Sequence, residues 1–282
     1  MSDSRPIGVF DSGLGGLTVL TELVQALPDE QFIYFGDTAR LPYGAKSRRI
    51  VQRYSEEVAD HLLQYDIKLL VIACNTATAH AESALTERLA ARPSPVPVVG
   101  VIEPGVIALI KRSRNQRLGV LGTRSTIKSG EYARRILKHR PDAEIFNKAC
   151  PLFVPLVEEG WIDKRVTRLV IQEYLSELQR EEVDTVVLGC THYPLLKATI
   201  QSEFPGLELV DSSRETASAV CDLLDAQNLR AGTSHAATGN SASAQGSRGS
   251  VRIELSDLTD QMNDLENLLA GIPVAKVEEV SL

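Results

Sequence analysis

Two cysteines, Cys74 and Cys190, occupy nearly the same local sequence in segments that lie far apart in the chain. The segments run from Leu70 to Thr76 and from Val186 to His192. In each, four aliphatic or small residues precede the thiol and two polar residues follow it, as though one unit had been duplicated. The apolar runs predict buried strands, and open α/β sheets bind ligands beyond the carboxyl ends of their strands. We therefore expect both thiols at a reaction site, each supplied by a different half of the chain.

Two thiols that face each other suit the removal of a proton from one face of a tetrahedral carbon and the return of a proton to the opposite face. The product of such a reaction is the mirror image of the substrate. The pKa of an ordinary cysteine, about 8.5, allows a thiolate to accept a proton and a thiol to donate one. Asp11, at the end of the first apolar run, and His192 are the neighbouring groups that could adjust the thiols or relay protons.

A packing role is the alternative, because free cysteines are commonly buried and inert. The repeated context favours a chemical role for Cys74 and Cys190. Cys150 lies in an apolar, loop-like stretch and Cys221 on an Ala/Leu-rich helical face, and neither shares that context. We assign these two cysteines to packing.

Short apolar runs alternate along the chain with longer stretches of helical periodicity, which is typical of βα units around a parallel sheet. Because most of these runs are continuous, their strands should be buried on both faces. The fold class is therefore α/β, with two similar lobes, each a mainly parallel sheet flanked by helices, and the active site in the cleft between them. The predicted strands are 7–10, 32–35, 69–73, 96–101, 118–121, 185–189 and 207–210, and the predicted helices include 47–64, 76–91, 125–138, 164–180 and 214–224.

The division into lobes follows from the order of these elements. The first lobe is predicted to comprise residues 1–98 together with a returning C-terminal tail, 211–282, and the second lobe residues 99–210. The run 91–97 contains three prolines, so we expect a hinge or a domain edge there.

The last part of the chain departs from the βα pattern. Residues 228–250 are rich in Ser, Ala and Gly and should form a flexible surface loop. After this loop the chain is expected to return as a strand, a helix and a strand at 251–255, 258–269 and 274–282, packed on the first lobe.

Composition and charge indicate a soluble, cytoplasmic protein that acts on small molecules. No apolar run approaches the roughly 20 residues of a membrane helix, and Met1 to Pro6 lead directly into a strand, so no leader segment is expected. The net charge of −7 offers no basic footprint for nucleic acid. Because the four cysteines lack metal or redox spacing, we expect free thiols and no metal site.

The glycine-rich segment from Asp11 to Gly16 follows a strand and opens a helix. It is similar to a phosphate-binding turn, but Thr18 stands where a dinucleotide fingerprint needs its last glycine, and the chain has no P-loop triplet. The glycines should instead let the backbone approach a small ligand, with Ser12 as a hydrogen-bonding group. A purely structural turn is the alternative.

Three further segments have both a functional and an ordinary interpretation. The backbone N–H groups of Tyr43 and Gly44 could bind a carboxylate, although the segment could be a simple turn. Residues 122–126 offer hydroxyl groups at a helix N-terminus, where an N-cap role explains at least one of them. One of the adjacent acids Glu158 and Glu159 is expected to point into the cleft, although adjacent acids are more often solvated.

Taken together, these motifs resemble the glutamate racemases of the aspartate/glutamate racemase family. The resemblance implies a two-domain α/β fold, interconversion of L- and D-glutamate without a cofactor, and a supply of D-glutamate for peptidoglycan synthesis. It also implies a homodimer. The matching segments, within about residues 7 to 220, are 11–16, 42–44, 74–77, 150–160 and 190–194.

The resemblance assigns roles to single residues. Cys74 would take the proton from D-glutamate and Cys190 the proton from L-glutamate, each returning it in the reverse direction. Asp11 and His192 would assist, with Glu158 near His192. The substrate contacts carried over are Asp11, Ser12, Pro42, Tyr43, Gly44, Asn75, Thr76, Thr126, Thr191 and His192.

Two other functions remain open. An aspartate racemase would use the same thiols on a substrate one methylene shorter, a difference worth only about 1 to 3 kcal/mol in a pocket. A non-catalytic protein that binds an amino acid or a protein partner would use the cysteines only for packing. Pyridoxal chemistry is disfavoured because the strand-end motifs contain no lysine for a Schiff base.

Overall fold

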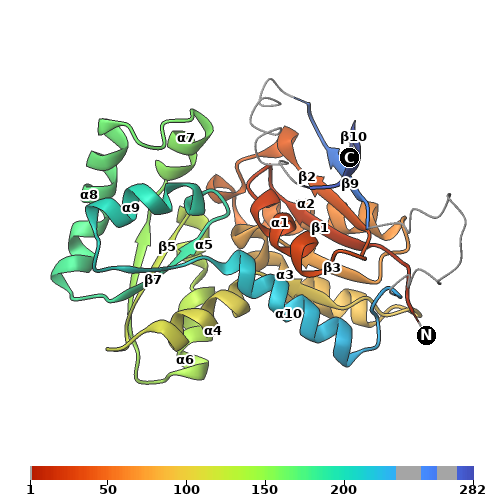
Figure 1. Ribbon diagram of the computed structural model, residues 1–282, viewed down its shortest axis with the longest axis horizontal. Coiled ribbons are helices and arrows are strands. Elements are labelled where there is room, and N and C mark those ends of the chain that lie inside the picture. Colours follow the sequence, from red (N-terminus) through yellow and green to blue (C-terminus); the bar gives the residue numbers. More distant parts are fainter. Residues whose placement is uncertain (1, 233–248, 259–271) are drawn as a thin grey trace, which may run out of the picture.

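The computed structural model describes residues 2–232, 249–258 and 272–282 and contains two α/β lobes side by side, each built on its own sheet (Figure 1). The chain passes from the first sheet to the second after β4 (Val98–Gly100) and returns after β8 (Glu208–Val210). Every strand pair in the described residues is parallel. The predicted fold class is confirmed. Within the same residues, no helix combines the length and apolarity needed to cross a bilayer.

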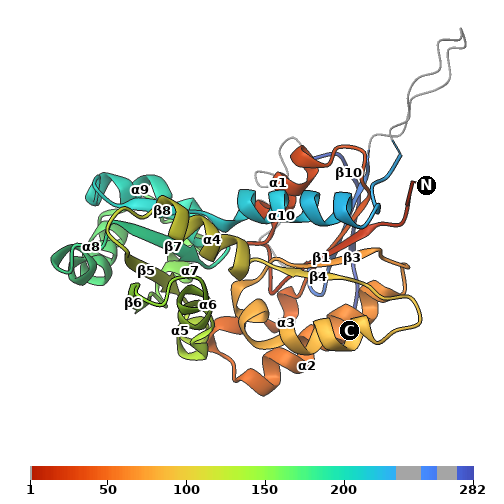
Figure 2. The ribbon, with the colours of Figure 1, turned by 90° about the horizontal axis from the view of Figure 1, so that it is seen from below.

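The first sheet consists of β4 and five further strands: β1 (Ile7–Asp11), β2 (Phe32–Gly36), β3 (Leu69–Ile72), β9 (Val251–Leu255) and β10 (Val274–Glu279). Their order is β10-β9-β2-β1-β3-β4. Helices α1 (Leu17–Ala26) and α10 (Ser212–Ala226) cover one face, and α2 (Arg48–Leu63) and α3 (Asn75–Ala90) cover the other (Figure 2).

Strand β3 shows why a continuous apolar run is needed here. Leu69 and Val71 belong to the core beneath α1 and α10, whereas Leu70 and Ile72 belong to the core beneath α2 and α3. Successive side chains of a strand point to opposite faces, so a sheet covered on both faces needs apolar residues at every position.

The second sheet has the order β6 (Glu144–Ala149), β5 (Arg117–Gly122), β7 (Thr185–Gly189) and β8. Helices α4 (Ile102–Arg112) and α6 (Glu131–His139) cover one face, and α8 (Arg165–Arg180) and α9 (Lys197–Glu203) cover the other. The short helices α5 (Arg124–Ser129) and α7 (Phe153–Glu158) follow β5 and β6. Short 3-10 helices lie at Thr38–Arg40, Tyr43–Ala45 and Tyr193–Leu196.

All seven predicted strands of the two sheets are present, with small shifts at their ends. Strand β6 was not predicted. It is an edge strand whose residues are only partly buried or exposed, so it lacks a continuous apolar run. The prediction of one helix over 125–138 was wrong, because Gly130 adopts a left-handed conformation (φ of 70°) that ends α5 before α6 begins.

The C-terminal segment completes the first sheet. Strand β9 pairs with β2, and β10 pairs with β9. Most of the predicted loop 228–250 and of the predicted helix 258–269 lies outside the described residues. The proline-containing run 91–97 connects α3 to β4 inside the first lobe, so the chain crosses between the lobes after this run.

Candidate active site

The carboxyl ends of both sheets border one cavity of about 200 Å³. Asp11 ends β1 and Cys74 follows the adjacent β3, while Thr123 and Cys190 follow the adjacent strands β5 and β7. The cavity is therefore lined by two thiols, one from each lobe. Sites for drug-sized ligands begin at roughly 300 Å³, so this smaller cavity suits a molecule of amino-acid size.

Most of the predicted site residues line this cavity, but Asp11 and Thr126 lie behind its wall. Among the described residues, no group of three or more His, Cys, Asp or Glu side chains is arranged to hold a metal ion. The lining residues that were predicted are Ser12, Pro42, Tyr43, Gly44, Cys74, Asn75, Thr76, Glu158, Cys190, Thr191 and His192.

Cys74 is the N-cap of α3, where its sulfur accepts a hydrogen bond from the backbone N–H of Ala77 at 3.4 Å. Its thiol also donates to the hydroxyl oxygen of Ser12 at 3.5 Å. Burial, and after it the negative charge of Asp11, raises the pKa of the Cys74 thiol to about 12. At neutral pH this thiol therefore carries its proton and can act as an acid.

Cys190 lies beside a histidine that is held by a carboxylate. Its sulfur is 3.8 Å from Nδ1 of His192, and Nε2 of His192 lies 3.5 Å from Oε1 of Glu158. Burial lowers the pKa of His192, but hydrogen bonding to Cys190 and Glu158 raises it by more, to about 10. A positive imidazolium stabilises a neighbouring thiolate, so the two thiols lie in opposite electrostatic surroundings. Glu159 is exposed, and Glu158 is the member of this pair that reaches the cavity.

Asp11 is fully buried behind the cavity wall. Its carboxylate accepts hydrogen bonds from the backbone N–H of Gly13 at 3.0 Å and from the hydroxyl of Thr191 at 3.4 Å. Burial raises the pKa of Asp11, and the positive charge of His192 opposes this shift. Since its hydrogen bonds in the described part of the chain go to neither thiol, Asp11 acts on Cys74 through its charge.

Gly15 lies where the glycine-rich segment of the first lobe meets the second cysteine segment. A Cβ atom at this position would lie 2.4 Å from Oγ1 of Thr191 and 2.8 Å from Nδ1 of His192. Any side chain here would collide with these two residues of the second lobe. The glycines were expected to let the backbone approach a ligand, but the group that Gly15 approaches is the opposite lobe, whereas Gly13 lines the cavity.

Asp37, which follows β2, anchors the turn that carries Tyr43 and Gly44. The Tyr43 hydroxyl donates to Oδ2 of Asp37 at 2.5 Å, and the Ser256 hydroxyl donates to Oδ1 at 2.9 Å. Nε of Arg40 donates to the same carboxylate at 2.8 Å. Asp37 has no exposed surface, so its charge is balanced within this group of side chains.

The comparisons with known proteins agree with this arrangement. The family described as Asp/Glu/Hydantoin racemase matches residues 7–220. A glutamate racemase of Geobacter metallireducens is 53% identical over 231 residues, which cover 82% of this chain and 84% of that protein. The crystal structure of a glutamate racemase from Francisella tularensis in complex with D-glutamate is 35% identical, with a TM-score of 0.86 and coverage of 99% of this chain and 98% of that chain. The chain belongs to the Asp/Glu/hydantoin racemase family.

Membership in this family confirms the predicted resemblance and the predicted enzyme class, a racemase. It favours that class over a non-catalytic binding protein. A second solved structure, the glutamate racemase of Thermus thermophilus in complex with beta-chloro-D-alanine, is 41% identical with a TM-score of 0.82 and covers 99% of this chain and 98% of that chain. The similarity thus extends over both lobes.

In this racemase, three threonine hydroxyls join the lobes beside the cavity. Oγ1 of Thr76, from the first lobe, lies 3.1 Å from Oγ1 of Thr123 and 3.0 Å from Oγ1 of Thr126. Thr123 is the N-cap of α5, which confirms the N-cap role expected within residues 122–126. Thr123 lines the cavity. Thr126 does not line it, but is buried and hydrogen-bonded to Thr76 and Thr123, which do.

Asn75 is also held across the lobes, since its amide Nδ2 donates to the Tyr132 hydroxyl at 2.8 Å. Tyr132 lies on α6 and is nearly fully buried. A residue at the amino end of α3 is therefore oriented by the second lobe, which the sequence did not indicate.

The remaining cysteines of this racemase lie in the hydrophobic cores, as predicted. Cys150 directly follows β6, but its side chain belongs to the core of the second lobe, and burial raises the pKa of its thiol. Cys221 packs against the core of the first lobe. A position after a strand is thus not sufficient for a thiol to reach the cavity.

Several residues that line the racemase cavity were not named individually as site residues from the sequence, although Gly13 belongs to the glycine-rich segment that was expected to approach a ligand. Most are apolar or glycine and carry no reactive group, so residue type alone offers no signal. Arg124 and Thr123 could have been found, because they stand in the segment recognised for its hydroxyl groups. The additional lining residues are Gly13, Leu41, Ala45, Thr123, Arg124, Pro151, Val154 and Pro155.

Proposed function

We propose that this racemase interconverts L- and D-glutamate, with Cys74 and Cys190 as its two acid–base groups. The observation that carries the proposal is that both strand-end thiols line one small cavity, each from a different lobe. Inversion at a carbon atom needs a base on one side and an acid on the other. The names of the similar proteins, including the one solved with D-glutamate, support glutamate as the substrate.

The surroundings of the thiols support a direction for each proton transfer. Nδ1 of His192 lies 3.8 Å from the sulfur of Cys190, and the pKa of His192 is raised to about 10. A positive charge therefore adjoins Cys190, which would take the α-proton of L-glutamate. Cys74, whose pKa is raised, would then donate its proton from the other side. In the reverse direction Cys74 is the base and Cys190 the acid.

The substrate would be held by polar groups of both lobes. Ser12, Asn75 and Thr76 come from the first lobe, and Thr191 and His192 come from the second. Hydroxyl and amide groups can donate hydrogen bonds to the two carboxylates of glutamate. The turn that carries Pro42, Tyr43 and Gly44 supplies a further wall, and Asp11 acts from behind Thr191.

The cellular role rests on the resemblance to glutamate racemases. On that basis we infer a homodimer that works in the cytoplasm without a cofactor and supplies D-glutamate for peptidoglycan synthesis.

The test is to incubate the purified protein separately with L- and D-glutamate in heavy water. The circular dichroism signal of either enantiomer should decay to zero while the α-hydrogen exchanges with deuterium. Cys74→Ser and Cys190→Ser should each lose at least about 100-fold in rate, the lower end of what a positioned acid or base contributes. An unchanged signal at high enzyme concentration would contradict the proposal.

Aspartate provides the matched comparison of substrates. One methylene in a pocket is worth about 10- to 200-fold in kcat/KM, so aspartate should react at least about 10-fold less efficiently than glutamate. A preference for aspartate would refute glutamate as the substrate, but it would not contradict the proposed acid–base chemistry of the two thiols.

A further inference from the structure

A second, larger cleft of about 980 Å³ adjoins the reaction cavity. The two share Gly44, Ala45 and Arg124 in their walls. One wall of the cleft is formed by the first lobe, at residues 44–48 and 78–83, and the other by the second lobe, at residues 124–135. A molecule in this cleft would therefore lie beside the reaction cavity and contact both lobes.

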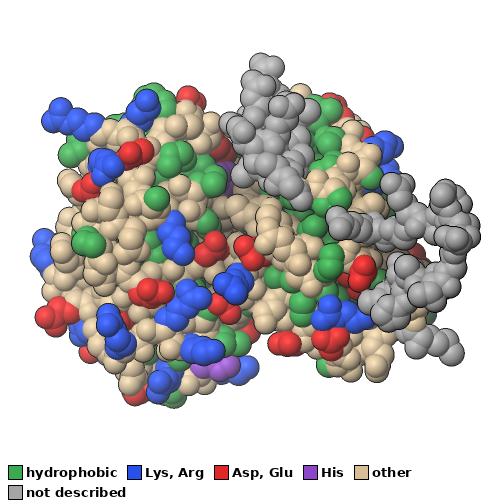
Figure 3. Space-filling view, in the orientation of Figure 1, with side chains coloured by type: hydrophobic (Ala, Val, Ile, Leu, Met, Phe, Trp, Pro, Cys, Tyr) green, Lys and Arg blue, Asp and Glu red, His purple; other side chains and the backbone are tan. Residues whose placement is uncertain are grey.

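The charge of the cleft is opposite to that of the whole chain. The chain has a net charge of −7, and on the face shown in Figure 3 acidic and basic side chains are interspersed. Among the described residues that line the cleft, a single carboxylate, Glu131, accompanies a larger set of cationic side chains. These are Lys46, Arg48, Arg124, Lys128, Arg134 and Arg135.

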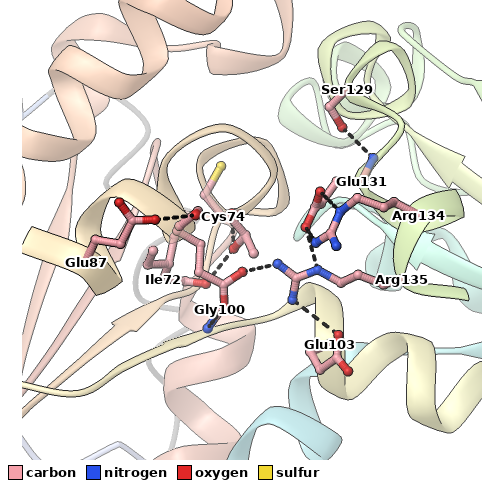
Figure 4. Close-up of polar contacts among 12 residues, drawn as sticks. Ile72, Cys74, Glu87, Gly100, Glu103, Ser129, Glu131, Arg134 and Arg135 are labelled. Carbon is pink, nitrogen blue, oxygen red and sulfur yellow. Dashed lines mark hydrogen bonds and ion pairs between the residues drawn. The ribbon is translucent and has the colours of Figure 1, made fainter. Parts of the chain in front are cut away.

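Two of these cations are already neutralised. Arg134 and Arg135 both pair with Glu131, and Arg135 also pairs with Glu103 (Figure 4). Arg135 forms a further ion pair with Glu82. Glu131, the carboxylate of the cleft, is therefore already paired with both arginines. Arg134 and Arg135 therefore leave little charge for a ligand.

The other four cations have no ion pair among the residues that the structure describes. Arg48, Arg124 and Lys128 are exposed and Lys46 is half-buried, so all four can meet a ligand from solvent. Lys46 and Arg48 belong to the first lobe, and Arg124 and Lys128 belong to the second. Unpaired charges on opposite walls would attract an anion with more than one charged group.

A hydrogen-bonded group among the lining residues connects these walls. Nε2 of His80, on α3, lies 2.8 Å from the hydroxyl oxygen of Ser125, on α5. The same hydroxyl donates to the backbone carbonyl of Lys46 at 3.2 Å. The two pairs of cations are thus mounted on walls that are already connected.

We propose that this basic cleft is a binding site for small polyanions, carboxylate or phosphate, and that it concentrates anionic glutamate beside the reaction cavity. This use of the cleft rests on the proposed function, whereas anion binding by itself does not. A basic, low-dielectric cleft raises the local concentration of an anionic substrate. Phosphate-type anions should occupy the same cleft and compete with glutamate.

Binding of inorganic pyrophosphate, measured by isothermal titration calorimetry at low ionic strength, tests the site directly and does not depend on activity. Arg48→Glu and Lys128→Glu should each weaken binding at least about 10-fold. Arg49→Glu is the matched control, because Arg49 is the exposed neighbour of Arg48 on α2 and does not line the cleft. It should change affinity less than twofold. The absence of pyrophosphate binding, or an equal effect of all three variants, would overturn the proposal.

Racemisation kinetics test the second part of the proposal. Arg48→Glu should raise the KM for glutamate about 3- to 10-fold with kcat within twofold, and the difference should shrink as salt is raised to 0.5 M, because exposed charges are then screened. Pyrophosphate should inhibit competitively in the wild type and less in Arg48→Glu. Unchanged KM and no inhibition, in a protein that racemises glutamate, would refute the role of the cleft. Pyrophosphate binding in a protein without that activity would instead refute the proposed function and keep the anion site.

Discussion

At the scale of single residues, the two thiols differ in what surrounds them. Cys74 is buried near the negative charge of Asp11, and Cys190 contacts His192, which is in turn held by Glu158. His192 belongs to the second strand end itself and stands where Thr76 stands in the first, whereas the fold brings Asp11 near Cys74 and Glu158 to His192.

This asymmetry predicts different isotope effects for two variants. The enantiomers have equal free energy in water, so kcat/KM must stay equal in both directions for any variant. The negative charge of Asp11 raises the pKa of Cys74 and so makes its thiolate a stronger base. We expect Asp11→Asn, which removes this charge, to show the larger primary deuterium isotope effect with α-deuterated D-glutamate, because Cys74 is the base in that direction. His192→Asn should show the larger effect with α-deuterated L-glutamate. Each variant is the control for the other. Equal isotope effects with both substrates in both variants would contradict the assignment of Asp11 to Cys74 and of His192 to Cys190.

The raised pKa of His192 predicts a pH dependence of stability. A histidine whose pKa is higher in the folded state stabilises the fold fully below its unfolded value of about 6.5, and this contribution is lost as pH rises toward the folded value. The folded value is about 10. The difference in unfolding free energy between wild type and His192→Asn, measured by urea denaturation, should therefore shrink between pH 6.5 and 10. In Glu158→Gln, which lacks one partner that raises the pKa, the loss should occur at lower pH. If the difference in unfolding free energy between wild type and His192→Asn stays constant over this pH range, the raised pKa of His192 is refuted.

At the scale of elements, the C-terminal segment contributes to the substrate turn. Pairing of β9 with β2 brings Ser256 to Asp37. Asp37 in turn holds Tyr43, which lines the cavity. The hydroxyl of Thr38 also donates to the backbone carbonyl of Asp257 at 2.6 Å. The segment that follows β9 thus fixes a turn more than two hundred residues earlier in the chain.

Loss of this anchor should weaken substrate binding more than catalysis. Hydrogen bonds to charged groups are worth about 1.5 to 3 kcal/mol, so Asp37→Asn should raise the KM for glutamate about 10-fold with a smaller change in kcat. Ser256→Ala should act in the same direction and more weakly. The control is Glu57→Gln, since Glu57 also pairs with Arg40, whereas the Tyr43 hydroxyl donates its hydrogen bond to Asp37. An equal KM in Asp37→Asn and Glu57→Gln would contradict the anchoring role.

At the scale of the whole molecule, the reaction cavity exists only while the lobes are in contact. Gly15, the three threonine hydroxyls and the bond between Asn75 and Tyr132 all lie at this contact. The thiols belong to separate sheets, so their relative position depends on these contacts.

Gly15→Ala should therefore damage catalysis without unfolding either sheet. The added methyl group would meet Thr191 and His192, and a misplacement of about 1 Å can cost about 100-fold in rate. We expect kcat to fall by about this factor while thermal unfolding changes little. Gly206→Ala is the control, because no atom of the described residues lies within 4 Å of a Cβ at that position. Wild-type activity in Gly15→Ala would show that the lobes do not need this close contact.

The sequence by itself determined the buried strands and the residues at their ends. A strand covered on both faces must be apolar throughout, so Leu69 to Ile72 and Thr185 to Gly189 could be recognised as strands, and the thiols that follow them could be placed. Edge strand β6 and the break at Gly130 were missed, since partial burial leaves a mixed pattern and a left-handed glycine has no periodic signature.

Only the tertiary structure decided which strand-end residues meet. It placed Cys150 in a core, Thr123 in the cavity wall and Thr126 behind it, and it joined Ser256 to Asp37. It also gathered into one cleft four cations, from two lobes, that form no ion pair with the residues the structure describes. Local patterns reflect the burial of a segment against its own surroundings, whereas contacts between distant segments depend on how the sheets pair and the lobes pack, which no local pattern records.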